Sequence, residues 1–199
     1  MKNPLRVTTS FLGLYAGLIA IQHGIFEILQ GSRAPAGLMF NAIGPPCQSE
    51  MVWHACFPAM TLIPNLLVTG IAAVVMGATL MLWSLFFVPR RYGNWILGIL
   101  SILLLLVGGG FVPVFIGVVA AIASRDLGRS SSRPRLAFLA VLWPWPLVLM
   151  TLWLPGSWLL GHFFGPAMLS AGGLLFLVFD ISLPVLAAVS GAARIIKGL

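Results

Sequence analysis

Charged residues are scarce in this sequence. Only 8% of its 199 residues are charged, and the chain has just four Asp and Glu residues. A soluble domain carries roughly 25% charged residues, so this chain has too few to cover a water-exposed surface. It also lacks a Walker loop and the GxGxxG, HExxH and CxxC motifs, the common signatures of nucleotide, dinucleotide and metal chemistry. The sequence therefore argues against a soluble protein, predicts no cofactor and names no reaction.

Apolar residues dominate instead. They make up 60% of the chain, and the mean hydropathy is +1.06. Several apolar runs exceed the roughly 20 residues that span a bilayer, as in LLVTGIAAVVMGATLMLWSLFFV. A membrane β-barrel would show short alternating segments, whereas these runs are continuous. We expect an all-α, polytopic membrane helix bundle that forms one integral domain over residues 1–199.

The apolar runs predict six membrane segments. GGGFVP at 108–113 interrupts one run, because glycine frees the backbone and Pro113 suits the first turn of a helix. Residues 94–126 then form a glycine-interrupted helical hairpin whose arms, about 20–25 Å long, either cross at a tilt or dip partway. WPWP at 143–146 is expected to kink the fifth segment. The predicted segments are approximately 7–30, 61–88, 94–109, 112–126, 136–154 and 167–192.

The basic residues predict the orientation. With a hairpin at 94–126 and both termini cytoplasmic, ten of the eleven Lys and Arg residues lie on the cytoplasmic side, and Arg33 is the exception. A single broken span would leave only four there, so the positive-inside rule favours the hairpin. The first segment is longer than the apolar core of a signal peptide, and we expect it to be retained. The sequence thus predicts a multi-pass protein of the cell (inner or plasma) membrane.

The net charge of +7 raises the question of nucleic-acid binding. The basic residues fall in short loops and do not follow one amphipathic face, and such loops set membrane topology. We therefore expect no nucleic-acid partner.

Both cysteines and all three histidines fall on the predicted outer side. Cys47 and Cys56 are nine residues apart in one outer loop, and that compartment is oxidising, so a disulfide is the natural interpretation. The alternative is a metal site that uses both thiolates with His54, but the spacing matches no common zinc pattern. We expect a disulfide and no metal ion.

The first segment carries a histidine and a carboxylate one turn apart. Small residues recur at steps of three and four, and this stripe continues to Glu27, which should therefore face another helix. His23 is its i−4 neighbour, and together they are expected to form the polar floor of an outward-facing pocket. The small-residue stripe is Gly13, Gly17, Ala20 and Gly24. The candidate ligand-binding residues are His23, Glu27, Gln30, Thr61, Asn65, Thr69, Gly109 and Gly110.

Asp180 is the second acid expected inside the membrane. An aspartate at a helix centre costs about 2.5–3.5 kcal/mol on insertion scales, so it should face protein. Counted along the helices, it lies about 10 Å deeper than His23, which predicts a separate site with Tyr15 as a candidate partner by depth. A structural, hydrogen-bonded role and a functional role both stay open.

Several strings resemble one family. HGIFEILQG, NAIGPPC, WHAC, PAMTLIPN and GGGFVP are similar to those of small prokaryotic membrane proteins known only as hypothetical proteins. The resemblance covers roughly residues 7–126, implies a polytopic membrane protein and carries no known activity.

Three functions compete at this level. The first is a binding or transport protein with an outward-facing polar pocket for a small or amphipathic molecule. The second is a structural or accessory subunit of a membrane complex, with a membrane-protein partner. The third is an intramembrane enzyme that acts on a lipid or isoprenoid and uses His23 and Glu27 as an acid–base pair. Whether the protein is an enzyme stays open. All three functions imply contact with the lipid bilayer.

Overall fold

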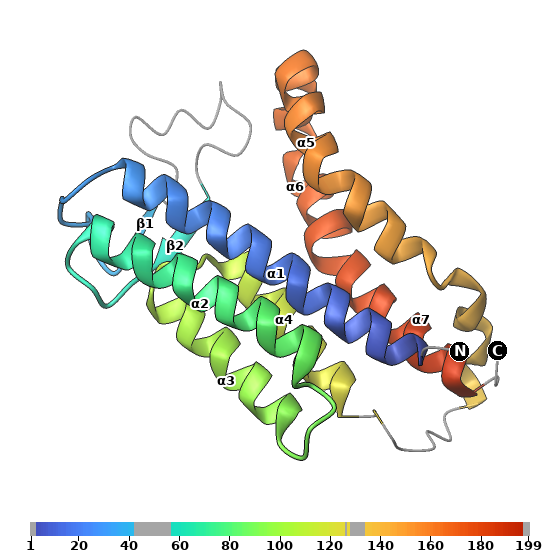
Figure 1. Cartoon of the computed structure of the whole chain (residues 1–199). Coiled ribbons are helices and arrows are strands. Elements are labelled where there is room, and N and C mark those ends of the chain that lie inside the picture. The colour runs from blue at the N-terminus through green and yellow to red at the C-terminus, as the bar shows by residue number, and fades with distance from the viewer. Residues whose placement is uncertain (1–2, 42–56, 126, 128–133, 197–199) are drawn as a thin grey trace.

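A computed structural model describes residues 3–41, 57–125, 127 and 134–196 of the chain. The protein is mostly helical, with one small two-stranded sheet. Its elements are, in chain order, α1 (Pro4–Leu29), β1 (Met39–Asn41), β2 (Pro58–Met60), α2 (Leu66–Phe86), α3 (Gly93–Leu106), α4 (Phe111–Ser124), the 3₁₀ helix η1 (Pro134–Leu142), α5 (Trp145–Ser170), α6 (Gly172–Leu175), the π-helix η2 (Phe176–Ser182) and α7 (Leu183–Ile196) (Figure 1).

In the described part of the chain, four helical stretches are long and apolar enough to cross a membrane. They are α1, α2, α5 and the continuous stretch from α6 through α7. This confirms a membrane-embedded helical protein. The remaining apolar helices, α3 and α4, have 14 residues each, so each is only about 21 Å long at 1.5 Å per residue.

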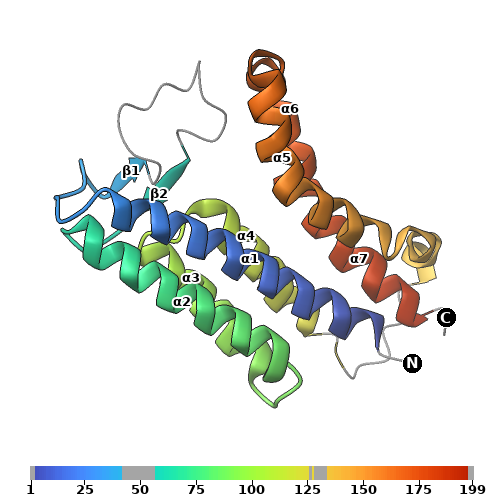
Figure 2. The same ribbon diagram turned by 45° about the horizontal axis from the view of Figure 1, so that its top comes forward.

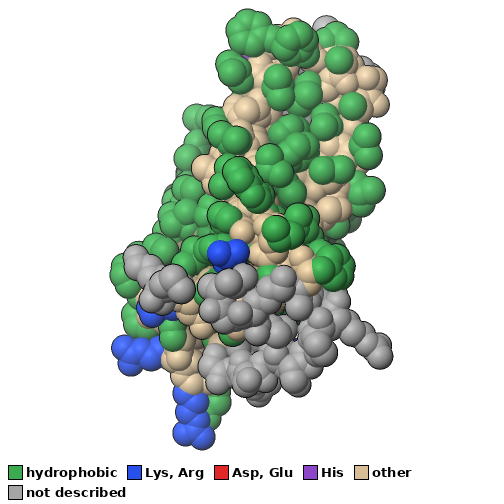
Figure 3. Space-filling model, turned by 90° about the vertical axis from the view of Figure 1, so that its right-hand side faces the viewer, with side chains coloured by type: hydrophobic (Ala, Val, Ile, Leu, Met, Phe, Trp, Pro, Cys, Tyr) green, Lys and Arg blue, Asp and Glu red, His purple; other side chains and the backbone are tan. Residues whose placement is uncertain are grey.

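The helices form two unequal parts. α1, α2, α3 and α4 make one slanted bundle, and α7 packs against α1 near the end at which α1 begins. α5, α6 and η2 (residues 145–182), which we call the C-terminal arm, lean away from α1 toward their far end (Figures 1 and 2). Figure 3 shows apolar side chains covering the arm and the arginine side chains of this face gathered toward the other end of the molecule.

Glycines bring α1 and α2 into close contact. Gly13, Gly17 and Gly24 on α1 face Gly70, Gly77 and Ser84 on α2, and we call this contact the glycine seam. A Cβ atom on Gly24 would lie 2.6 Å from the carbonyl oxygen of Gly70, and one on Gly70 would lie 2.5 Å from the carbonyl oxygen of Gly24. The predicted stripe is therefore confirmed as a helix-packing surface.

A glycine turn joins α3 to α4, as predicted for residues 108–110. Gly108 and Gly110 have φ of +93° and +80°, a region that favours glycine. The amide of Gly108 donates to the carbonyl of Met60, and Thr61 forms an antiparallel bridge with Val107. β2 in turn pairs with β1, with Met60 opposite Met39. The turn and the sheet are thus fixed to each other at one end of the bundle.

The fifth helix differs from the prediction in both its bounds and its kink. WPWP begins α5 and does not kink it, because Pro146 stands in its first turn. The helix then runs past the predicted end at 154, through Pro155 and Pro166, to Ser170, with non-helical torsions at Phe164. Residues 155–166, predicted as a connection, are thus helical. Their apolar sequence favours this, since a helix satisfies its own backbone groups in an apolar setting.

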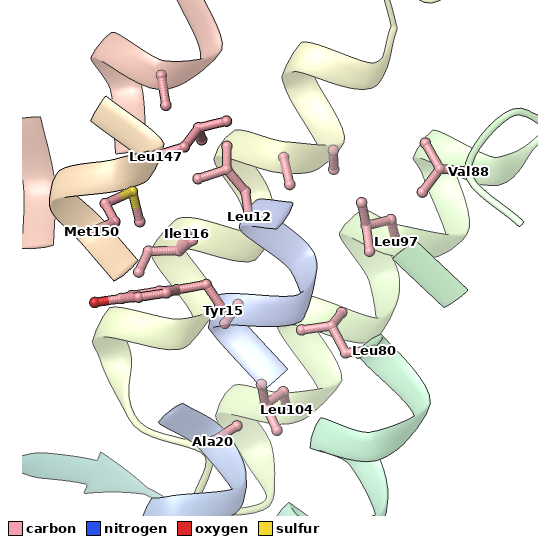
Figure 4. Close-up of a cluster of buried hydrophobic side chains, with 14 of the residues drawn as sticks. Leu12, Tyr15, Ala20, Leu80, Val88, Leu97, Leu104, Ile116, Leu147 and Met150 are labelled. Carbon is pink, nitrogen blue, oxygen red and sulfur yellow. The ribbon is translucent and has the colours of Figure 1, made fainter. Parts of the chain in front are cut away.

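The core lies where the bundle meets the foot of the arm. Buried side chains from α1, α2, α3, α4, α5 and α7 form one continuous cluster. Figure 4 shows Tyr15 of α1 in this cluster, with its ring extending toward α5 beneath Met150. Tyr15 thereby carries a hydroxyl group from the core to the border between the two parts.

Candidate functional site

A small cavity lies at the border between the bundle and the C-terminal arm. Its volume is about 40 Å³, enough for a few water molecules or one small polar group. We call it the lateral cavity. Residues from α1, the start of α4, α5, η2 and the segment before β2 line it, and five of them are polar or titratable: Tyr15, Gln22, His23, Ser157 and Asp180.

His23 forms part of the bundle wall of this cavity. Its side chain is 5% exposed, and its ring stacks on Phe57 with the ring centroids 6.2 Å apart. A Cβ atom on Gly110 would lie 2.6 Å from Cε1 of the ring, so the imidazole lies directly on the glycine turn. Within the described part of the chain, Nδ1 is buried and has no hydrogen-bond partner. Such orphaned groups are rare in proteins and mark places that need an explanation.

Asp180 reaches the lateral cavity from the arm. It lies in η2, where the Ser182 hydroxyl donates to the carbonyl of Leu177 five residues earlier. Single π-helical turns inside α-helices occur frequently at functional sites. Phe179, the preceding residue, stacks on Trp153 of α5 with ring centroids 3.9 Å apart. The π-turn thus leaves Phe179 against α5 and Asp180 at the cavity.

Asp180 and His23 therefore line one cavity and do not form the two separate sites expected from the sequence. The expected separation of about 10 Å came from counting residues along each helix. That count gives relative depth only for parallel helices, and α6 and η2 lean away from α1 (Figure 1). Tyr15, the partner suggested by depth, lines the same cavity as Asp180.

Aromatic side chains form much of the remaining wall. Trp153, Trp158 and Phe57 line the cavity, and Trp158 stacks on Phe26 of α1 with ring centroids 6.2 Å apart. The lateral cavity thus combines hydrogen-bonding groups with large apolar rings, the mixture typical of small-molecule sites.

Glu27 faces protein, as expected, but does not line the lateral cavity. It is 0% exposed, and neither carboxyl oxygen has a hydrogen-bond partner in the described residues. The carboxyl group lies on the glycine turn, since a Cβ atom on Gly108 would be 2.5 Å from Oε2. Glu27 is therefore not hydrogen-bonded to His23, although the two side chains are one helical turn apart.

Two amides of the glycine turn are hydrogen-bonded within the chain. The amide of Gly108 donates to the carbonyl of Met60, and that of Gly109 donates to the carbonyl of Leu104. Gly109 and Gly110 were candidate ligand-binding residues. Their observed contacts are structural, with Gly109 packed on Leu104 and Gly110 on His23.

Polar residues at the start of α2 and just before it hold the bundle together. Thr69 donates its hydroxyl to the carbonyl of Val107 and shares a hydrogen bond with the Thr61 hydroxyl. Asn65 caps the start of α2 by accepting from the Val68 amide, and its side-chain amide donates to the Ser32 hydroxyl at 2.9 Å. These three candidates thus link α2 to the α3–α4 turn and to the end of α1.

Gln30 belongs to a different cavity. It lines an open pocket of about 580 Å³ beyond the end of α1, together with Arg33, Asn41, Phe40 and Leu66. We call this the outer pocket. The predicted candidates are therefore divided: His23 lines the lateral cavity, Gln30 lines the outer pocket, and the others make contacts within the bundle.

Several cavity residues were not predicted as site residues. Gln22 and Ser157 carry the polar groups that were overlooked, and Trp153 and Trp158 the rings. Gln22, a polar residue inside an apolar run, was a usable signal. Ser157 was not, because its segment was expected to be a connection. The predicted disulfide between Cys47 and Cys56 falls outside the described residues, as does His54. His162 is exposed on α5.

Comparisons with known proteins add no identification. No family model, no curated protein and no solved structure matches this chain. The resemblance to a family of small prokaryotic membrane proteins therefore stays a prediction from the sequence. The described residues also contain no group of three or more His, Cys, Asp or Glu side chains that could hold a metal ion.

Proposed function

We propose that this protein binds a small or amphipathic molecule, with the ligand's polar group in the lateral cavity. The observation that carries the proposal is that His23 of α1 and Asp180 of η2, which come from different parts of the molecule, line one cavity. The buried Nδ1 of His23 has no hydrogen-bond partner in the described part of the chain. A ligand group that hydrogen-bonds there would remove the free-energy penalty of an unsatisfied buried atom.

The size and surroundings of the cavity favour an amphipathic ligand. A volume of about 40 Å³ admits a polar head, whereas a whole drug-sized ligand needs roughly 300–1,000 Å³. Exposed apolar side chains continue along the arm next to the cavity, among them Trp158, Leu159 and Phe176. The apolar part of the ligand would lie along this surface, in the lipid.

Six membrane segments with both termini cytoplasmic are part of the proposal. The arginines whose side chains the structure describes support it: Arg33 lies beyond the end of α1, and the other five lie at the opposite end of the bundle. These are Arg6, Arg90, Arg91, Arg125 and Arg194. In this orientation the lateral cavity lies in the outer half of the membrane, because His23 and Gln22 belong to the last two turns of α1.

Cysteine labelling in intact cells tests the orientation. In a chain with Cys47→Ser and Cys56→Ser, an impermeant thiol reagent should label Ala36→Cys from outside. It should label Ser131→Cys only after permeabilisation. Labelling of Ser131→Cys in intact cells would reverse the proposed orientation.

Native mass spectrometry of the purified protein tests the binding function. The wild-type protein should carry a small molecule, and Asp180→Asn and His23→Ala should each retain much less of it. Thr9→Ala is the matched control, because Thr9 is a buried polar residue of α1 that lies outside the cavity and donates to the carbonyl of Arg6. A wild-type protein without a bound molecule, or equal loss in the control, would contradict the proposal.

The accessory-subunit alternative has one supporting observation. Thr61, Asn65 and Thr69 bond within the chain, as expected of residues that only hold helices together. The intramembrane-enzyme alternative has less support, because His23 and Glu27 do not form a hydrogen-bonded pair. Copurification of a stoichiometric protein partner, with no bound small molecule, would favour the accessory role.

A further inference from the structure

A second polar pocket lies at the opposite end of the bundle from the outer pocket. It is open, has a volume of about 520 Å³ and is formed where α2 turns into α3 beside the end of α4. Three of the residues that line it are arginines: Arg90, Arg91 and Arg125. We call it the arginine pocket. Neither of the other two cavities described above has more than one arginine in its lining.

Among the residues that the structure describes, no carboxylate lines the arginine pocket. The two described acidic residues lie elsewhere, Glu27 against the glycine turn and Asp180 at the lateral cavity. The three arginines therefore bring three positive charges to the pocket with no acidic side chain in its described lining. An anion from outside the chain is the chemistry that would balance them.

Each of the three arginines lies over an aromatic ring, with Arg90 over Phe87 at 5.9 Å from the ring centroid. The guanidinium carbon of Arg125 lies 5.0 Å from the centroid of the Trp95 ring, and that of Arg91 lies 5.3 Å from the Tyr92 ring. A guanidinium group stacked on a ring keeps its N–H edges available for a planar or tetrahedral oxyanion. The side chain of Asn94 also lines the pocket and can donate to a phosphate oxygen.

The surface next to the pocket is suited to lipid. Trp95, Ile99 and Ile102 are exposed on α3 at steps of four and three, so they lie on one helix face. This apolar face starts at Trp95, a pocket residue. Trp and Tyr favour the membrane–water interface, which places the arginines at the depth of lipid headgroups and the isoleucines at the depth of acyl chains.

We infer that the arginine pocket binds the phosphate group of an anionic phospholipid, whose acyl chains lie along the exposed face of α3. Basic pockets between helices on the cytoplasmic side are a known mode of lipid-headgroup binding. The inference does not depend on the lateral cavity or on the ligand proposed there. The competing explanation is that these arginines only set topology, in which case their charge would act anywhere along that surface.

The experiment compares two double variants with the same change in charge. Arg91→Gln with Arg125→Gln removes two pocket arginines, and Arg6→Gln with Arg194→Gln removes two arginines at the same end of the bundle that do not line the pocket. Each protein is purified with an equimolar mixture of phosphatidylglycerol and phosphatidylcholine, and native mass spectrometry counts the retained lipids. Thermal unfolding in the presence of phosphatidylglycerol, or of inorganic phosphate alone, gives a second measurement.

The wild-type protein and the control should retain phosphatidylglycerol in preference to phosphatidylcholine. The pocket variant should lose about 25-fold in affinity for the anionic lipid, since each arginine near the surface contributes roughly fivefold. Arg91→Lys with Arg125→Lys keeps the charge and should retain most of the preference, which would show that the loss is not misfolding.

Two results would overturn the inference. Equal loss of phosphatidylglycerol in the pocket variant and the control would mean that only overall charge matters. Thermal protection by inorganic phosphate equal to that by the lipid would mean that the ligand is a free phosphate and that the face of α3 plays no part.

Discussion

The N-terminal bundle and the C-terminal arm are built from equally apolar helices but are packed very differently. The most apolar window of α1 is 50% buried, whereas the windows of α5 and of the stretch from α6 through α7 are 22% and 17% buried. The difference lies in the small residues. The glycines of α1 face α2 at backbone distance, while Gly156, Gly165 and Gly173 of the arm have nothing within 4 Å of a Cβ position.

This comparison teaches what packs helices in lipid. Lipid tails are as apolar as leucine, so hydrophobic residues alone do not drive helices together, and close approach of backbones does. The bundle has a glycine seam and is closely packed. The arm has large exposed side chains and contacts the bundle mainly at its foot. The lateral cavity lies between a closely packed wall that carries His23 and a loosely packed wall that carries Asp180.

The largest expected effect comes from filling the glycine seam. In Gly70→Ala the new methyl group would meet the backbone of Gly24 at 2.5 Å, and backbone cannot move aside as a side chain can. We expect a loss of about 3 kcal/mol, the upper end for an overpacked core. The midpoint of unfolding in mixed detergent micelles measures it.

Gly156→Ala is the matched control for the seam. It adds the same methyl group to a helical glycine with nothing within 4 Å, so its stability should stay within about 0.5 kcal/mol of the wild-type value. Equal losses in the two variants would mean that the arm is packed as closely as the bundle, and the comparison would fail.

A smaller effect is expected at the glycine turn. Gly108→Ala adds a methyl group 2.5 Å from Oε2 of Glu27, at a φ of +93°. Gly31 has a φ of +78° and nothing within 4 Å, so Gly31→Ala reports the backbone strain alone, of order 1 kcal/mol. Gly108→Ala should lose about 1–2 kcal/mol more, because Glu27 is buried and has little room to move.

Replacing Glu27 by the shorter aspartate should partly restore the stability lost in Gly108→Ala. Glu27→Asp withdraws the carboxyl group from the turn, so Gly108→Ala should be less damaging in that background than in the wild-type protein. The unfolding midpoints of the two single variants and the double variant measure this coupling. Additive losses would show that the contact between Glu27 and Gly108 contributes nothing.

The sequence predicted the bundle better than the arm, and the reason is physical. In α1 a spacing of three and four residues leads to one face, so the stripe from Gly13 to Glu27 predicted the packing correctly. In the arm the π-turn at 176–182 adds a residue to one turn and shifts every later position. The spacing of residues in the sequence predicts neither that turn nor the helix over residues 155–166.

The candidate site was predicted only in part for a related reason. His23 was found because a histidine in an apolar run stands out, and Asp180 for the same reason. His23 and Asp180 line the same cavity because of the angle at which the arm leaves the bundle. That angle depends on side-chain contacts between segments that are distant in the sequence. Thr61 and Thr69 were also singled out, but hydrogen-bonding residues that bind a ligand and those that bind a neighbouring helix look alike in a sequence.

A further prediction tests whether Asn65 binds a ligand or a neighbouring segment of the chain. Asn65→Ala removes the cap of α2 and the bond to Ser32, and loss of a cap costs about 1 kcal/mol. Ser32→Ala removes the second bond alone and should cost less than half as much. Both should leave ligand retention unchanged. If Asn65→Ala lost the ligand without losing stability, Asn65 would be a ligand-binding residue, as the sequence predicted.

The smallest effect is expected on the exposed face of the arm. Leu159 and Leu174 are 61% and 65% exposed, so in a membrane their side chains contact lipid. Replacing either by alanine exchanges contacts with lipid for other contacts with lipid, and stability should change by no more than about 0.5 kcal/mol. Leu97→Ala, at a fully buried position of α3, should cost about 2–5 kcal/mol and shows that the unfolding assay can detect a packing loss.

The same two arm variants decide whether the arm faces lipid or another protein. If lipid covers it, the native mass of the wild-type protein and of both variants should correspond to one 21.3 kDa chain with its lipids. If a partner covers it, the wild-type protein should run as a larger assembly, and Leu159→Ala or Leu174→Ala should weaken that assembly while the isolated chain keeps its stability. That second outcome would end the contrast between a packed bundle and an unpacked arm, since the arm would be packed as well, against a different chain. It would also make the accessory-subunit role the better explanation of the exposed apolar surface.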